Sequence, residues 1–305
     1  MTGGVGGAKL ALGLAERLAP DEIAFVVNTG DDFEHLGFHI SPDLDTLTYT
    51  LAGVANQTYG WGRKGETWQF IGALEALGGE SWFRLGDLDL ALHVRRRELL
   101  AAGAGLAEAT RQIADAFGIP NTIWPMSDDP VRTVVHTVED GELPFQHYFV
   151  RERCAPAVSG FEFRGLEQAR PNPEFLQALT DCAGVIICPS NPFVSVDPIL
   201  NLPGVRAALA QCSAPIVAVS PIVSGLAIKG PAAKMMSELG VPNTAAAVAA
   251  HYDGLISGFV LDAEDVDLAT SVAVPTLATP SVMRTIDDKR ALASAVLDFV
   301  KQLAN

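Results

Sequence analysis

The sequence contains few cysteines, few basic residues and no long apolar run. The four cysteines among 305 residues form no CxxC pair, so we expect reduced thiols rather than a disulfide framework. Only 21 lysines and arginines oppose 36 acidic residues, and the formal charge of -15 argues against nucleic acid or an anionic membrane as a partner. Every apolar run is interrupted well before the roughly 20 residues that a membrane helix needs, and no signal-peptide pattern opens the chain. These features predict a cytoplasmic protein.

Short β-branched runs alternate with helical patterns in two parts of the chain, residues 1–60 and 166–305. This alternation predicts an α/β fold, a Rossmann-like parallel sheet flanked by helices, with ligands at the carboxyl ends of the strands. Residues 61–165 break the pattern with helices and with two strands around the turn "EDGE". They predict an inserted α+β subdomain between the two halves of the core.

A glycine-rich turn opens the chain as "GGVGGAKL". Its candidate ligand-binding residues are Gly3, Gly4, Gly6, Gly7 and Lys9. Glycines let the backbone approach a phosphate, and the helix that follows adds the positive end of its dipole. The turn fits neither GxxxxGK[ST] nor GxGxxG, so a plain tight turn is the alternative. Such a turn usually follows a strand, whereas only Met1 and Thr2 precede it here, and we expect further apolar residues upstream.

Four carboxylates lie within fifteen residues, in "NTGDD" after a predicted strand and in "SPDLDT" at a predicted helix start. They are Asp31, Asp32, Asp43 and Asp45. Hard carboxylate oxygens beside a phosphate turn suit Mg²⁺, although each Asp alone is also common as a turn former or first-turn residue of a helix. We expect Mg²⁺ here, with Asp31 and Asp45 as metal ligands and catalytic carboxylates, and with Asp32 and Asp43 as substrate-binding residues.

Further polar side chains follow the later strands or lie in the inserted segment. The candidates for substrate binding are His93, Arg96, Met126, Ser127, Asp128, Ser190, Asn191, Ser220 and Lys229. An Asn-Pro turn, a solvated helix face or an ordinary core side chain is the alternative at each position.

Taken together and in this order, "GGVGGAKL", "NTGDD…SPDLDT", "GWG…ETW", "LGDLDLALH", "PMSDDPVRT", "PSNP" and "SPIVSGLAIKGP" resemble the 2-phospho-L-lactate transferase family, and the resemblance spans nearly the whole chain. It implies a Mg²⁺-dependent enzyme of coenzyme F-420 biosynthesis. Such an enzyme moves a phospho-acid group (2-phospho-L-lactate or phosphoenolpyruvate) from a guanosine diphosphate conjugate to the ribityl hydroxyl of the deazaflavin Fo, releasing GMP.

The resemblance also implies where the substrates lie. The opening glycines would hold the diphosphate, the turns at Ser190–Asn191 and Ser220–Lys229 would line the nucleotide side, and the inserted segment would cover the deazaflavin. A nucleotide-sugar-binding regulatory protein of the gluconeogenesis-factor type is the alternative, and a dinucleotide dehydrogenase would need a cleaner GxGxxG. The sequence leaves the phospho-acid open, and also whether the chain forms a homodimer.

Overall fold

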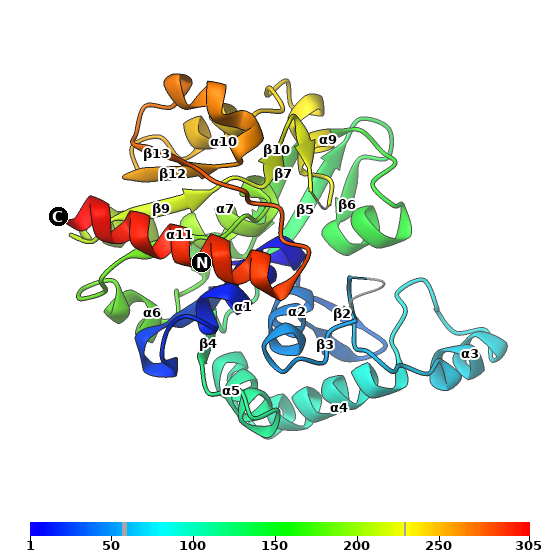
Figure 1. Ribbon diagram of the computed structural model, residues 1–305. Coiled ribbons are helices and arrows are strands. Elements are labelled where there is room, and N and C mark those ends of the chain that lie inside the picture. The colour runs from blue at the N-terminus through cyan, green and yellow to red at the C-terminus, as the bar shows by residue number, and fades with distance from the viewer. Residues whose placement is uncertain (57–59, 229) are drawn as a thin grey trace.

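The computed structural model describes residues 1–56, 60–228 and 230–305 (Figure 1). The α-helices are α1 (Gly4–Ala15), α2 (Pro42–Leu51), α3 (Gln69–Ala76), α4 (Asp87–Ala101), α5 (Leu106–Ala116), α6 (Pro173–Ala178), α7 (Asp197–Leu200), α8 (Val205–Gln211), α9 (Ala232–Glu238), α10 (Ala245–His251) and α11 (Ile286–Ala304). The strands are β1 (Ala24–Val27), β2 (Phe33–His35), β3 (Phe38–Ile40), β4 (Thr122–Pro125), β5 (Arg132–Thr137), β6 (Glu142–Pro144), β7 (Val158–Arg164), β8 (Val185–Ile187), β9 (Ile216–Val219), β10 (Ile222–Val223), β11 (Leu226–Ala227), β12 (Gly258–Leu261) and β13 (Thr276–Ala278). The remaining helical segments, which are 3-10 or π helices, are η1 (Pro20–Glu22), η2 (His147–Arg151), η3 (Leu166–Gln168), η4 (Pro192–Val196) and η5 (Ala263–Ser271).

The predicted parallel sheet is confirmed, in two parts. β4 pairs with β1 on one side, and β8, β9, β12 and β13 follow one another on the other side, all in parallel register. β1, β8, β9 and β12 are the apolar runs expected from the sequence, and their residues are almost entirely buried, as in a sheet covered on both faces.

The first two residues join the two parts of the sheet. Thr2 forms a parallel bridge with Val27. On the opposite side the Met1 amine donates to the carbonyl of Ile186 at 2.7 Å, and the amide of Cys188 donates to the carbonyl of Met1 at 3.0 Å. The spatial order is therefore β4, β1, residues 1–2, β8, β9, β12, β13. In this Rossmann order the chain reverses its direction of growth between residues 1–2 and β8, where such sheets bind their ligands.

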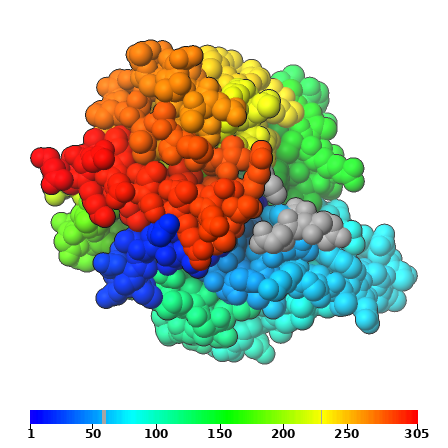
Figure 2. All heavy atoms as spheres, viewed as in Figure 1, coloured from blue at the N-terminus to red at the C-terminus, as the bar shows by residue number. Residues whose placement is uncertain are grey.

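Helices cover both faces of the sheet. Along β9, Val217 and Val219 face α1 and α11 on one side, with Leu10 and Val296 in the same cluster. Their neighbour Ala218 faces the cluster that contains α7, α8, α9 and α10. In the space-filling view the orange-red C-terminal helix lies directly against the blue N-terminal one (Figure 2). The glycine turn is thus fixed by α11 as well as by the sheet.

The segment 61–165 differs from a simple insertion. Its strand β4 pairs with β1 from Ala24 opposite Thr122 to Val27 opposite Pro125, so this segment also supplies the edge of the parallel sheet. The strands around the turn "EDGE" form as expected, as β5 and β6, and with β7 they make a separate antiparallel sheet. Among the described residues no helix is both long enough and apolar enough to cross a bilayer.

Candidate active site

The glycine turn lies at the reversal point of the sheet, against the loop that follows β8. Ser190 Oγ accepts from the amide of Gly3 at 3.1 Å and donates to its carbonyl at 2.7 Å. Gly4 has a φ of +66°, and a Cβ added at Gly6 would lie 2.5 Å from the carbonyl oxygen of Pro189. Only glycine fits both constraints without strain. The N-terminus of the 12-residue helix α1 therefore opens directly at this point.

A pair of buried carboxylates shares one amide group beside the turn. The side-chain nitrogen of Asn28, the residue after β1, donates to Asp31 Oδ1 and to Asp43 Oδ2, each at 3.0 Å. Asp43 Oδ1 accepts from the backbone amide of Gly4 at 2.6 Å. Asp31 Oδ2 accepts from Gln146 at 3.3 Å. The pair thus links the end of β1, the start of α2 and the start of α1.

Burial raises the pKa of both carboxyls. It brings the pKa of Asp43 to about 6, against hydrogen bonds from Asn28 and Gly4 that favour the anion. The pKa of Asp31 lies well above its ordinary range because of burial first and then the charges of Asp43 and Asp32. Within the described part of the chain no basic side chain forms an ion pair with Asp31 or Asp43; two such adjacent buried acids are what a divalent cation neutralises, and carboxylate oxygens are the ligands that Mg²⁺ prefers. The residues present therefore fit such an ion.

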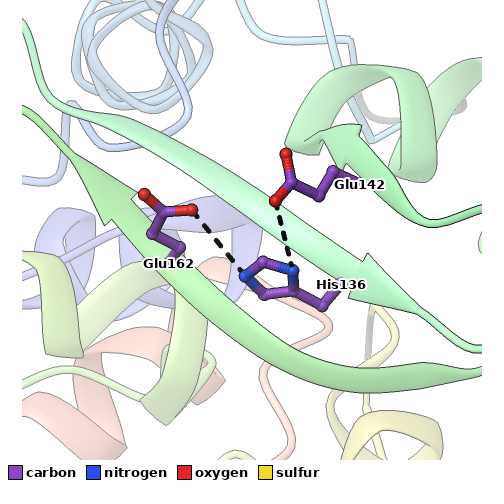
Figure 3. Close-up of side chains that lie close together, drawn as sticks. All are labelled: His136, Glu142 and Glu162. Atoms are coloured by element: carbon purple, nitrogen blue, oxygen red, sulfur yellow. Dashed lines mark ion pairs between the residues drawn. The ribbon is translucent and has the colours of Figure 1, made fainter.

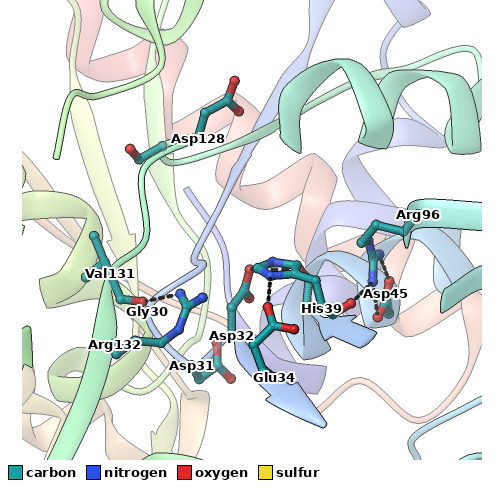
Figure 4. A network of polar contacts seen from close by, with 12 residues as sticks. Gly30, Asp31, Asp32, Glu34, His39, Asp45, Arg96, Asp128, Val131 and Arg132 are labelled. Carbon is teal, nitrogen blue, oxygen red and sulfur yellow. Dashed lines mark hydrogen bonds and ion pairs between the residues drawn. The ribbon is translucent and has the colours of Figure 1, made fainter. Parts of the chain in front are cut away.

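Asp32 follows Asp31 in the chain but contacts other residues than the pair does. Its Oδ2 accepts from Ser41 at 2.7 Å and contacts Nε2 of His39 at 3.0 Å, whose Nδ1 contacts Glu34 (Figure 4). Its Oδ1 is buried and has no hydrogen-bond partner within the described part of the chain. Burial raises the pKa of Asp32, and the contacts with His39 oppose this increase. This carboxylate is thus held by one oxygen and leaves the other available.

Asp45 belongs to a different network. Its carboxylate forms a two-pronged ion pair with Arg96 of α4, with Nη1 to Oδ2 at 3.2 Å, and both side chains are buried (Figure 4). His93, one turn earlier on α4, lies 3.5 Å from Asp89, and Asp89 accepts from the hydroxyl of Tyr49. His93 and Arg96 are therefore both brought to Asp45, with His93 Nδ1 4.0 Å from Asp45 Oδ2, whereas Asp31 shares the Asn28 amide with Asp43.

The other predicted site residues make contacts within the fold. Lys9 donates to the carbonyl of Met283, and Met126 is completely buried in the core. Ser127 donates to the carbonyl of Arg170, and Asp128 accepts from the amide of Ala107 at the start of α5.

The turns expected on the nucleotide side are also engaged locally. Asn191 accepts from the amide of Phe193 at 3.0 Å, and the hydroxyl of Ser220 donates to the carbonyl of Ile222 at 2.9 Å. Lys229 lies outside the described residues.

A cluster of His136, Glu142 and Glu162 could also hold a metal by its composition (Figure 3). It lies on the antiparallel sheet, and each imidazole nitrogen is 3.8 Å from a different glutamate. Arg164 already pairs with both glutamates, and all four side chains are substantially exposed. This is the pattern of a surface charge network rather than of a catalytic centre.

Sequence reasoning missed four residues that the structure brings to the carboxylates: Asn28, His39, Arg132 and Gln146. Asn28 stands in the quoted motif "NTGDD", so its position after a strand was a usable signal. Arg132 stands in the motif "PMSDDPVRT", but it and Gln146 reach the carboxylates from the antiparallel subdomain, and no local pattern predicts that contact. Arg132 lies close enough for its charge to lower the pKa of Asp31 and Asp32.

Comparison with known proteins places this geometry in context. The sequence pattern of the family described as "2-phospho-L-lactate transferase CofD" matches residues 1–271. A phosphoenolpyruvate transferase of Streptomyces griseus is 38% identical over 311 residues, which cover 99% of this chain and 98% of the relative. A 2-phospho-L-lactate transferase of Methanosarcina mazei is 38% identical over 264 residues, covering 87% and 86%.

Among solved structures, a member of the UPF0052 family from Bacillus halodurans superposes with a TM-score of 0.61 at 14% identity, covering 97% of this chain and 96% of that one. At this identity the likeness concerns the fold alone.

Proposed function

This chain belongs to the 2-phospho-L-lactate transferase family, and from that premise we propose that it transfers a phospho-acid group from a guanosine diphosphate conjugate to the deazaflavin Fo. The oxygen of the ribityl hydroxyl attacks the phosphorus that carries the acid. As that P–O bond forms, the bond from this phosphorus to the bridging oxygen of the guanosine phosphate breaks. GMP leaves with the bridging oxygen, and the proton of the hydroxyl passes to solvent.

The observation that carries the proposal is the buried pair of Asp31 and Asp43 beside the N-terminus of α1. Phosphoryl transfer needs positioning and neutralised charge more than covalent chemistry. Gly4 joins the two features, because its amide binds Asp43 at 2.6 Å while it begins the helix. A diphosphate at this reversal point of the sheet would lie against both the helix dipole and the acid pair.

We assign Mg²⁺ to Asp31 and Asp43 rather than to Asp31 and Asp45. Asp45 already has its charge balanced by Arg96, whereas the pair that shares the Asn28 amide does not. When bound, Mg²⁺ supplies charge neutralisation to the phosphates of the donor. The pKa of about 6 for Asp43 means that the carboxylate is ionised, and so able to bind a cation, at neutral pH.

Asp32 is the carboxylate that we assign to the acceptor. Ser41 and His39 hold its Oδ2, and its Oδ1 stays without a partner among the described residues. An oxygen fixed in this way can accept the proton of the ribityl hydroxyl in a hydrogen bond and direct the hydroxyl oxygen at the phosphorus. Ser190 would act indirectly, because it fixes the backbone of Gly3.

The test is to incubate the protein with Fo, Mg²⁺ and each guanosine diphosphate conjugate, followed by mass spectrometry. The expected products are GMP and the coupled deazaflavin in equal amounts, and a chelator should abolish both. Nucleotide binding without GMP release would contradict the transferase activity, and would favour the regulatory binding protein instead.

A further inference from the structure

Arg132 is a basic side chain near the carboxylates, and it has no role in the function proposed above. It is the first residue of β5, in the antiparallel subdomain. The amide of Thr133, its neighbour, donates to the carbonyl of Gly30 at 2.5 Å and so ties the start of β5 to the turn that contains Asp31. The backbone of Arg132 is also paired with Arg164 of β7, and its guanidinium lies beside this turn (Figure 4).

The guanidinium is close to the acids, but among the described residues it forms no ion pair with them. It lies beside Asp31 and Asp32 (Figure 4). Among the described residues, however, neither carboxylate comes within ion-pair distance, and its hydrogen bond is to the backbone carbonyl of Val131 at 2.8 Å (Figure 4). Since a guanidinium has five N–H groups in a planar fork, most of its donors remain for a ligand. By contrast, both terminal nitrogens of Arg96 donate to the carboxylate of Asp45.

The position of Arg132 also indicates which part of a donor it meets. Gly4 and the N-terminus of α1 adjoin Asp43 at one edge of the acid pair. Arg132 lies beside Asp31 and Asp32, at the other edge, where the amide of Thr133 is tied to Gly30 (Figure 4). A diphosphate bound at the α1 edge would extend its terminal group across Asp31 toward Arg132. That group ends in a carboxylate, which would be repelled by these acids without a cation of its own.

We propose that Arg132 binds the carboxylate of the phospho-acid and thereby selects acid-bearing donors. This inference rests on the proposed transferase function. A planar guanidinium matches a carboxylate with two parallel hydrogen bonds, whereas a lysine in its place would supply only a point charge. Arg132 is a binding residue in this scheme, at the end of the donor opposite the guanosine.

The test is calorimetric titration with three ligands in the presence of Mg²⁺: GDP, the guanosine diphosphate conjugate of phosphoenolpyruvate, and a guanosine diphosphate ethyl ester that lacks the carboxylate. The intact protein should bind the acid conjugate about 10- to 100-fold more tightly than the ethyl ester, the range for a charged hydrogen-bonded contact. Arg132→Gln should reduce this ratio to within about threefold and leave the Kd for GDP and the ester within about twofold. Arg132→Lys should retain part of the ratio.

Arg164→Gln is the matched control, because Arg164 faces Arg132 across the β5–β7 pair but binds Glu142 and Glu162 on the surface. It should leave all three affinities unchanged. Equal weakening of all ligands in Arg132→Gln would overturn the proposal and place the side chain on the diphosphate. An unchanged ratio, or no ratio in the intact protein, would overturn it too. Failure of the intact protein to bind any guanosine ligand would instead overturn the donor assignment, and the role of Arg132 with it.

Discussion

Asp43 and Asp45 lie two residues apart in one motif, and the structure predicts that the same substitution has opposite effects on stability at the two positions. Burial raises the pKa of Asp43 from an ordinary value of 3.8 to about 6. The folded protein therefore loses about 3 kcal/mol when this group is ionised, because each pKa unit corresponds to about 1.36 kcal/mol. Asp43→Asn removes that cost; the new side-chain oxygen can still accept from the Gly4 amide, while the hydrogen bond from Asn28 is lost, so about 3 kcal/mol is the upper limit of the gain.

Asp45→Asn leaves Arg96 with an uncompensated buried charge. Breaking a buried pair from one side costs about 3–5 kcal/mol, and Arg96 is only 3% exposed. At pH 7 and without metal, Asp43→Asn should therefore stabilise the protein by up to about 3 kcal/mol, or about 5 °C in Tm for a chain of this length. Asp45→Asn should destabilise it by at least as much.

The sign of the pH dependence follows from the raised pKa of Asp43. Between about pH 4 and 6 the folded state binds more protons at this group than the unfolded state does, so its cost is absent at low pH and fully present above pH 6. The stability gained in Asp43→Asn should thus be largest at pH 7 and vanish near pH 4. Comparing the variant with the intact protein cancels the titration of all unrelated groups.

The assay is chemical unfolding of metal-free protein at several pH values, repeated with Mg²⁺. The ion should stabilise the intact protein and Asp45→Asn, by about 2.7 kcal/mol at one hundred times its Kd, but not Asp43→Asn. Turnover should be lost in Asp43→Asn despite its higher stability. Equal destabilisation by both substitutions would refute the reasoning, since Asp43 would then be a satisfied structural acid. An undiminished effect of Mg²⁺ on Asp43→Asn would remove this residue from the ion site.

Two further predictions test the surroundings of the site. Gly6→Ala should destabilise the protein by about 1–3 kcal/mol in chemical unfolding, because its Cβ would lie 2.5 Å from the Pro189 carbonyl oxygen. Gly72→Ala on α3, where a Cβ would meet nothing within 4 Å, should stabilise it by about 0.5–1 kcal/mol. A change of the same sign at both positions would contradict the close packing of the glycine turn. His136→Ala should leave turnover and Mg²⁺ dependence within about twofold, since Arg164 already balances the neighbouring glutamates, and a large loss of activity would show that the surface cluster takes part in the reaction.

Much of the fold could be predicted because the buried strands are read from local runs. β1, β8, β9 and β12 each consist of a few consecutive apolar residues, and α2 begins with Pro42 after Ser41 as expected. β4 escaped because its four residues end in Trp124 and Pro125, which is an unusual composition for a strand.

The full length of helix α4 was also not predicted from the sequence. Its buried positions include His93 and Arg96, so it shows no continuous apolar stripe. In such a helix the buried side is read only once its partner is known, and that partner, Asp45, lies 51 residues away.

Only the part of the site formed by residues that are near one another in the sequence could be predicted. The strand end and the helix start that hold Asp31 and Asp43 are neighbours in the sequence, so their meeting could be expected. Gln146 reaches Asp31 from 115 residues away, and Arg132 arrives by the docking of an antiparallel sheet. Such long-range contacts depend on how two sheets pack, which no motif encodes.

The pairing of Asp31 with Asp43 rather than with Asp45 has a simpler cause, which helix geometry supplies. Successive residues of an α-helix are rotated by about 100°, so positions i and i+2 point about 200° apart. Asp43 and Asp45 both lie in the first turn of α2 and therefore cannot serve one ion together. Whichever faces β1 joins Asp31, and the other must find a partner on the opposite side of α2. Arg96 of α4 is that partner. The motif "PDLD" thus divides its two acids between the ligand site and the anchoring of the segment that covers it.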